Sequence, residues 1–148
     1  MKTFTVVVPG VPPSVNQRMS HHWSKAAEVI RLYRTVACVA TKDAIDESEI
    51  DVVPWLEENL RLVIWHYPET LRGDAHNREK CVVDGIVDGL NLALEMTVKG
   101  QRSRKIFNDS RVAICSTHPQ RRPDAPCVVC EVGPEDQFSF DFSGRATT

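Results

Sequence analysis

The sequence predicts an α+β domain in which the order of elements is strand, helix, strand, helix, strand, strand. Two observations lead to this prediction. Four short runs of apolar and β-branched residues are each bounded by proline, glycine or polar residues, as strands usually are. Two longer segments instead repeat apolar residues every three or four positions, which is typical of amphipathic helices. A mixed sheet with helices packed on it is therefore expected.

The elements are placed along the chain by these patterns and by their boundary residues. Residues 46–58 are acidic and contain a proline, so a loop is expected there. Gly85 and Gly89 should weaken the second helix. Residues 133–148 show no helical period, so a flexible tail is expected after a single domain at residues 1–132. In chain order, the predicted elements are a strand at 4–8, a helix at 25–43, a strand at 60–67, a helix at 77–96, and strands at 111–115 and 127–132.

The composition fits one compact domain rather than a membrane or disulfide-rich protein. Of the 148 residues, 42% are hydrophobic and 26% are charged, which is ordinary for a chain with a single core. The net charge of −2 means that binding to nucleic acid would need local basic patches and metal ions that offset acidic groups. Five cysteines, no signal-peptide pattern and no long apolar run predict a reduced, cytoplasmic protein without a membrane span.

Polar and ionisable residues concentrate between residues 71 and 88, where a predicted strand gives way to a predicted helix. Asp74 and His76 are two residues apart, so they would point to the same side of an extended segment. Asn77 is a suitable helix N-cap, and Lys80 lies one turn inside the helix. The residues that recur at every fourth position, and so share one helix face, are His76, Lys80, Asp84 and Asp88.

Asp74 and Asp109 are the strongest candidates for catalytic chemistry, because each lies beside the end of a predicted strand and next to a turn residue. Two carboxylates brought together in space can hold Mg²⁺. Such an ion can generate a hydroxide nucleophile and stabilise charge on a phosphate. The alternative is that both are turn-forming residues with local hydrogen bonds. Lys80 could reach a scissile phosphate, or it could pair with Asp84 or His76 on a solvated helix face.

Two further features are open to a functional and a structural interpretation. The basic stretch at residues 98–106 could grip a phosphate backbone, although charge runs are usually solvated. Cys127 and Cys130 have the spacing of metal ligands. In a strand, however, these two side chains point to opposite faces, and the chain has no second pair, so a buried structural role is favoured.

Several motifs occur in an order that resembles one family. The segment Asp74-x-His76-Asn77-x-x-Lys80-x-x-x-Asp84 is followed by Asn108-Asp109-Ser110-Arg111-Val112. This pattern resembles the RusA family of Holliday-junction resolvases, whose signature is Asp-x-Asp-Asn-x-x-Lys-x-x-x-Asp and then Asp-Asp-x-x-Val. The N-terminal Pro12-Pro13-Ser14-x-Asn16 looks like the family's Pro-Pro-Ser-x-Asn. The resemblance covers residues 4–132.

The resemblance implies a homodimeric, Mg²⁺-dependent endonuclease of mixed α/β fold that cuts four-way DNA junctions, forks and related branched DNA in recombination, repair or replication. The exposed edge of the N-terminal strand is one possible dimer seam. By family association, such nucleases are common in phages and prophages. Carried over by position, Asp74, His76 and Asp109 would bind the metal, and Lys80 would be the catalytic or DNA-contacting lysine. Asn77 and Asp84 would support the site. The DNA contacts expected on this basis are Arg72, Lys99, Arg102, Arg104, Lys105, Asn16 and Arg18.

Two departures from the family pattern qualify this expectation. The middle acid of the motif is His76 here, and an imidazole suits Mn²⁺ better than Mg²⁺. The spacing between Asp84 and Asp109 is also longer than usual, partly through what looks like an extra helical turn and partly through the basic stretch. The protein could therefore prefer Mn²⁺, or it could bind junctions without cutting them. A dimeric interaction module that recruits partners through its tail is a further alternative.

The tail suggests a separate partner. It resembles the short peptide by which bacterial replication proteins dock on the sliding clamp, and a flexible acidic and aromatic segment could order on contact with a groove. The alternative is that its aromatic residues pack back on the domain or on a dimer partner. The residues expected to contact the clamp are Gln137, Phe138, Ser139, Phe140 and Phe142.

Overall fold

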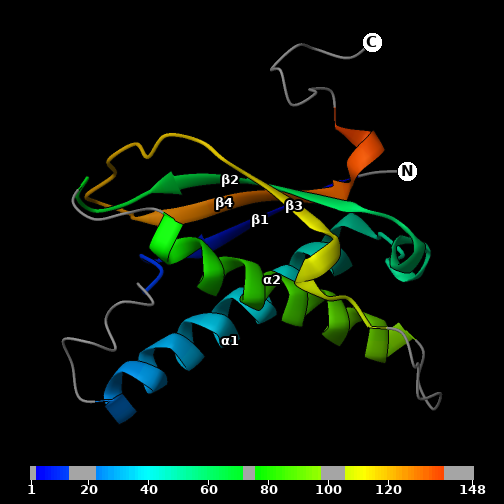
Figure 1. Cartoon of the computed structure of the whole chain (residues 1–148), viewed down its shortest axis with the longest axis horizontal. Helices are drawn as coiled ribbons and strands as arrows, with labels where there is room; N and C mark the ends of the chain where they lie inside the picture. Colours follow the sequence, from blue (N-terminus) through cyan, green and yellow to red (C-terminus); the bar gives the residue numbers. More distant parts are fainter. Residues whose placement is uncertain (1–2, 14–22, 72–75, 98–105, 139–148) are drawn as a thin grey trace.

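The computed structural model describes residues 3–13, 23–71, 76–97 and 106–138. It confirms a single α+β domain with the predicted order of elements (Figure 1). The strands are β1 (Phe4–Pro9), β2 (Leu60–Tyr67), β3 (Val112–Ser116) and β4 (Cys127–Pro134). The helices are α1 (Trp23–Ser48) and α2 (His76–Thr97), with short 3-10 helices η2 (Val53–Glu57), η3 (Asp109–Arg111) and η4 (Glu135–Gln137). None of the helices in these ranges is both long and apolar enough to cross a membrane.

The four strands form one mixed sheet in the order β1-β4-β2-β3. β4 runs antiparallel to both of its neighbours, whereas β2 and β3 are parallel, with Leu60 opposite Val112 and Ile64 opposite Ser116. A parallel pair needs a crossover connection, and α2 lies in the segment that joins these two strands. Figure 1 shows both long helices on the same side of the sheet. The carboxyl ends of β2 and β3 therefore lie at one edge, close to where α2 begins.

The helix-facing side of the sheet forms the core, because alternate residues of each strand point to that side. Along β1, Phe4, Val6 and Val8 are buried, whereas the residues between them are exposed. The expectation of a plain loop at residues 46–58 is wrong. α1 continues to Ser48, and η2 buries Trp55, which is 1% exposed and stacks on Phe4 with 5.8 Å between the ring centroids.

The two glycines of α2 mark the place where it packs against α1. A Cβ atom added at Gly85 would lie 2.4 Å from the Cβ of Ala37, and one added at Gly89 would lie 2.5 Å from the Cβ of Thr41. Because Gly85 and Gly89 are four residues apart, both face α1 from the same side of α2. The glycines lower the intrinsic helix propensity of α2, as the sequence indicates, but they allow a close helix contact that no larger residue would permit.

The expectation of a flexible tail from residue 133 onward is wrong for residues 133–138. β4 extends to Pro134 and η4 follows it, with the Glu135 amide donating to the Asn59 carbonyl at 2.9 Å. Arg61 forms an ion pair with Glu135 at 3.1 Å, and its guanidinium lies 5.7 Å from the ring centre of Phe138. Residues 133–138 are therefore part of the folded domain, since hydrogen bonds and an ion pair hold them to β2 and to the residue before it. Residues 139–148 lie outside the described residues.

Candidate active site

The strand-to-helix junction predicted from the sequence is present. β2 ends at Tyr67, and α2 begins at His76 beyond the carboxyl end of the parallel pair. Asp74 and the side chains of His76 and Asn77 lie outside the described residues. The helix start is itself relevant to chemistry, because free backbone amides at a helix N-terminus favour a phosphate group or another anion.

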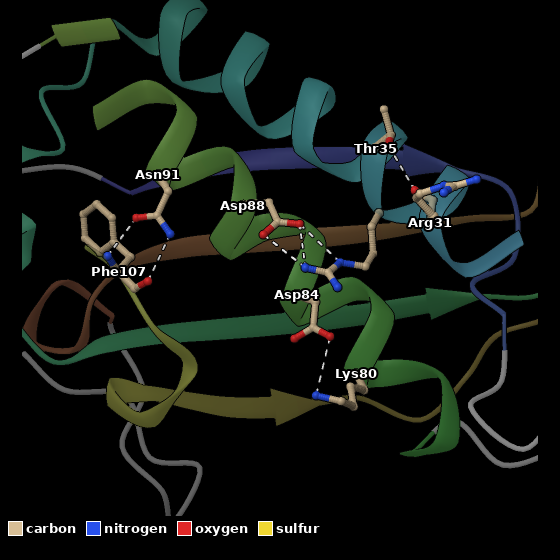
Figure 2. A network of polar contacts seen from close by, with 8 residues as sticks. Arg31, Thr35, Lys80, Asp84, Asp88, Asn91 and Phe107 are labelled. Carbon is tan, nitrogen blue, oxygen red and sulfur yellow. Dashed lines mark hydrogen bonds and ion pairs between the residues drawn. The ribbon is translucent and has the colours of Figure 1, made fainter. Parts of the chain in front are cut away.

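Lys80 lies near the start of α2, before the residues of the helix that are buried against the sheet. Its side chain is 65% exposed. Its Nζ atom lies 3.5 Å from Oδ2 of Asp84, one turn further along the helix (Figure 2). The ion pair that the sequence suggested as an alternative role for Lys80 therefore exists. Exposed pairs of this kind contribute little to stability, so the ammonium group remains available to a ligand that approaches from solvent. Asp84 is thus the ion-pair partner of Lys80, and its supporting role at a catalytic site stays a prediction.

Three residues that the sequence did not single out connect the helix start to the sheet. The Ser116 hydroxyl, at the end of β3, donates a hydrogen bond to Oε1 of Glu79 in the first turn of α2. Nε2 of His66, a buried residue near the end of β2, lies 3.4 Å from the same hydroxyl. No motif links these three positions in the sequence, because only the parallel pairing of β2 and β3 brings them together. The contacts fix the first turn of α2 against the strand ends.

Basic side chains also gather at this end of the sheet. The loop after β3 packs on the residues that follow β2: the Arg122 amide donates to the Pro68 carbonyl at 2.8 Å, and the Arg121 side chain donates to the Glu69 carbonyl at 3.2 Å. The Arg122 guanidinium also lies 4.4 Å from the ring centre of Tyr67. Both arginines are exposed, as is Lys80. The adjacent Arg121 and Arg122 are the sequence signal that could have indicated a phosphate contact in this loop.

A small cleft lies beside the start of α2, between the ends of the strands and the loop after β3. It has a volume of about 30 Å³ and is lined by His66, Tyr67, Arg78 and Pro119 among others. That volume holds about one water molecule.

The structure does not bring Asp109 to the start of α2. Asp109 opens η3, directly before the amino end of β3. Since β2 and β3 are parallel, this position lies at the opposite edge of the sheet from α2's first turn, about 16 Å away for a five-residue strand. The contacts of Asn91 support the same position for Asp109. The Asn91 side chain accepts a hydrogen bond from the Phe107 amide at 2.8 Å and donates one to the Phe107 carbonyl at 3.0 Å (Figure 2). Asn91 is fifteen residues past His76, or about 22 Å along the helix.

The expectation that Asp109 joins Asp74 and His76 around one metal ion is therefore wrong for Asp109. The physical reason is the length of α2, which carries the chain from one edge of the sheet to the other before β3 begins. The Asn108 side chain accepts a hydrogen bond from the Ser110 amide at 3.0 Å and so caps the short 3-10 helix that Asp109 opens. In the described ranges, no three His, Cys, Asp or Glu residues lie close enough to hold a metal ion.

Of the other predicted sites, the structure describes the pair of cysteines but not the expected DNA contacts. Cys127 and Cys130 are both buried free thiols, which confirms the structural role favoured for them. Burial raises the pKa of the Cys130 thiol to about 12, so it stays protonated and is a poor metal ligand. The expected DNA contacts lie outside the described residues; these are Asn16, Arg18, Arg72, Lys99, Arg102, Arg104 and Lys105.

The predicted clamp-binding peptide is split by the structure. Gln137 ends η4, and Phe138 is half-buried beside Arg61. Ser139, Phe140 and Phe142 lie outside the described residues. Docking on a sliding clamp stays a prediction, and a deletion that tests it should remove only residues 139–148, because a longer one would remove part of β4 or η4.

Comparison with known proteins assigns no family. A scan against protein-family models gave no match for this chain, and a search of the curated proteins gave none.

Proposed function

We propose that this protein is a metal-dependent endonuclease that cuts branched DNA, four-way junctions above all, with its catalytic centre at the amino end of α2. The observation that carries the proposal is the position of the motif Asp74-x-His76-Asn77-x-x-Lys80. It begins in the segment between β2 and α2 and continues into the start of α2, where its lysine is exposed. Exposed Arg121 and Arg122 at the same edge add positive charge for a phosphate backbone.

The donor set at this junction fits a transition metal better than Mg²⁺. Asp74 supplies a carboxylate and His76 an imidazole, a combination that suits Mn²⁺. With Asp109 at the other edge of the sheet, the acidic ligands of the family pattern are reduced further, which lowers the affinity expected for Mg²⁺. When bound, such an ion supplies an activated water and a positive charge next to the scissile phosphate.

The chain's own groups carry the rest of the mechanism. Lys80 stabilises the negative charge that grows on the phosphate oxygens as the bond to the leaving oxygen breaks. The α2 N-terminus directs backbone amides toward the same phosphate. The contact between Glu79 and Ser116 holds the first turn of α2, and hence Lys80, in a fixed position relative to the sheet.

The position of Asp109 favours a second candidate, a protein that binds junctions but has lost cleavage. One acid of the family pattern is replaced by His76, and another lies at the opposite edge of the sheet. Such a protein would keep the basic surface and the fold while lacking a complete metal site. The two candidates differ in whether the strand is cut, and they agree in predicting tighter binding to four-way junctions than to duplex DNA.

Replacing Lys80 with methionine is expected to slow junction cleavage on the order of 100-fold, because it removes the cation that faces the reacting phosphate. Lys42→Met is the matched control, since Lys42 forms the equivalent pair with Asp46 four residues later, but on α1. Both variants are assayed on a synthetic four-way junction with Mn²⁺ under single-turnover conditions. Equal rates for Lys80→Met and the control would exclude a catalytic role for Lys80.

A further inference from the structure

A groove lies on the face of the sheet that carries no helix. Ile64 is buried in the core, so Trp65 beside it points to the opposite face, and Tyr67 follows on that face. The loop between β3 and β4 runs beside β2 and away from the two helices (Figure 1), with the Thr117 amide donating to the Ile64 carbonyl at 2.9 Å. The groove between this loop and the strand has a volume of about 300 Å³, and its lining residues are Trp65, His66, Tyr67, Thr117, His118 and Gln120.

The floor of the groove suits a flat aromatic ring. Trp65 is half-buried and lies opposite Val129 of β4, which in turn lies opposite Val7 of β1, so an apolar row crosses the sheet beside the indole. Tyr67 lies two residues further along the same face of β2, and the Arg122 guanidinium lies 4.4 Å from its ring centre. The bases of single-stranded nucleic acid stack on aromatic rings and on guanidinium planes. Two stacking surfaces therefore lie next to each other on this face.

The edge of the groove is polar, and none of the six lining residues is acidic. His118 and Gln120 are exposed there. A glutamine amide both donates and accepts hydrogen bonds, which matches the hydrogen-bonding edge of a base. Arg121 and Arg122 follow in the same loop, are exposed, and add positive charge for the phosphates on either side of such a base. An aromatic floor, an amide at the edge and neighbouring cations together fit a nucleotide better than an aliphatic ligand.

We propose that this groove binds one unpaired base of a DNA strand, stacked on Trp65 and with its hydrogen-bonding edge toward Gln120. The loop side of the groove begins at Thr117, directly after Ser116, whose hydroxyl donates to Glu79 in the first turn of α2. The bound base therefore lies at the edge of the sheet that carries the candidate catalytic centre. The inference rests on the proposed function for the class of ligand, and it specifies the part of a branched substrate that is held, a nucleotide without a partner at the branch point. Binding in the groove requires no metal ion.

Binding of a single-stranded oligonucleotide in EDTA tests the inference separately from cleavage. The probe is a fluorescein-labelled DNA strand of about 12 nucleotides and mixed sequence, and the full-length protein is titrated into it while fluorescence anisotropy is recorded. Trp65→Ala should raise Kd on the order of 10-fold, because one base loses its stacking surface, whereas Trp65→Phe should stay within about 3-fold of the wild type. Leu32→Ala is the matched control. Leu32 is a large apolar residue that is 58% exposed, but it lies on α1, on the other side of the sheet, so Kd should not change.

The fluorescence of Trp65 reports the contact itself. A base that stacks on an indole quenches its emission, so unlabelled oligonucleotide should lower the tryptophan fluorescence of the wild-type protein. Trp65→Phe should lose most of this decrease while it still binds the strand. Trp55 is 1% exposed, so its emission serves as an internal background.

The outcomes separate this inference from the nuclease proposal. A wild-type protein that does not bind the strand, binding without quenching, or a Trp65→Ala variant that binds as tightly as the wild type would each overturn the groove as a base-binding site. None of these results would alter the expected cleavage of a four-way junction. If the wild type bound and quenched as expected but cut no junction with either metal, the nuclease proposal alone would fail.

Discussion

Replacing Asp74 with asparagine is expected to slow cleavage of a four-way junction on the order of 1000-fold while leaving junction binding within about 3-fold of the wild type. Asparagine keeps the size of the side chain and one oxygen, but it removes the negative charge that a divalent ion requires. Cleavage is measured under single-turnover conditions with Mn²⁺, and binding is measured in Ca²⁺ by gel shift. Undiminished cleavage by this variant would exclude Asp74 from the metal site.

Asp109→Asn is the matched comparison, because it makes the same chemical change at the other acid of the family pattern. The parallel pairing of β2 and β3 places Asp109 at the far edge of the sheet from α2's first turn. We therefore expect cleavage by this variant to stay within about 3-fold of the wild-type rate. If Asp109→Asn lost activity as completely as Asp74→Asn, the two carboxylates would have to act at one site.

The Gly85→Ala variant is expected to lower the free energy of unfolding by about 2 to 3 kcal/mol. Alanine has a higher helix propensity by about 1 kcal/mol, so in an exposed helix this change would stabilise the protein. At this position the new Cβ would lie 2.4 Å from the Cβ of Ala37 and 3.2 Å from the Arg34 carbonyl oxygen. The two helix backbones must then separate. Urea unfolding followed by circular dichroism measures the difference.

A compensating variant separates this steric effect from any other. In an Ala37→Gly background, the Cβ that clashes is absent and only the 3.2 Å contact with the Arg34 carbonyl oxygen remains, so Gly85→Ala should be far less destabilising. The difference between the two backgrounds is the coupling energy of the pair, expected to be about 2 kcal/mol or more. If Gly85→Ala stabilised the wild-type protein, or if the two backgrounds gave the same change, the close contact between α1 and α2 would not limit packing.

The local part of the fold could be predicted from the sequence. β2 occupies the predicted residues 60–67, and α2 begins at His76, one residue before the predicted start, so that Asn77 lies inside the helix and is not its N-cap. These elements carry strong local signals, which are an alternating apolar run in one case and a helical period of apolar residues in the other. The position of the candidate site, at the junction between β2 and α2, could be predicted for the same reason.

The parts that depend on tertiary contacts could not be predicted. From the sequence alone, Gly85 and Gly89 are only residues of low helix propensity. Their packing role could not be predicted, because helix propensity contains no information about a neighbouring helix. Trp55 lies in an acidic, proline-containing segment with no periodicity, and its burial follows from stacking on Phe4, which is far away in the sequence. The position of Asp109 depends on the parallel pairing of β3 with β2. A motif match gives the order of residues along the chain but not the edge of the sheet at which each one arrives.

The central claim is tested most directly by cleavage of a synthetic four-way junction with the purified wild-type protein, with Mn²⁺ and Mg²⁺ assayed side by side. The endonuclease proposal predicts cutting with Mn²⁺ and slower cutting with Mg²⁺, because His76 replaces an acid in the motif. Tight binding to the junction without cutting in either metal would contradict it and would support the junction-binding alternative.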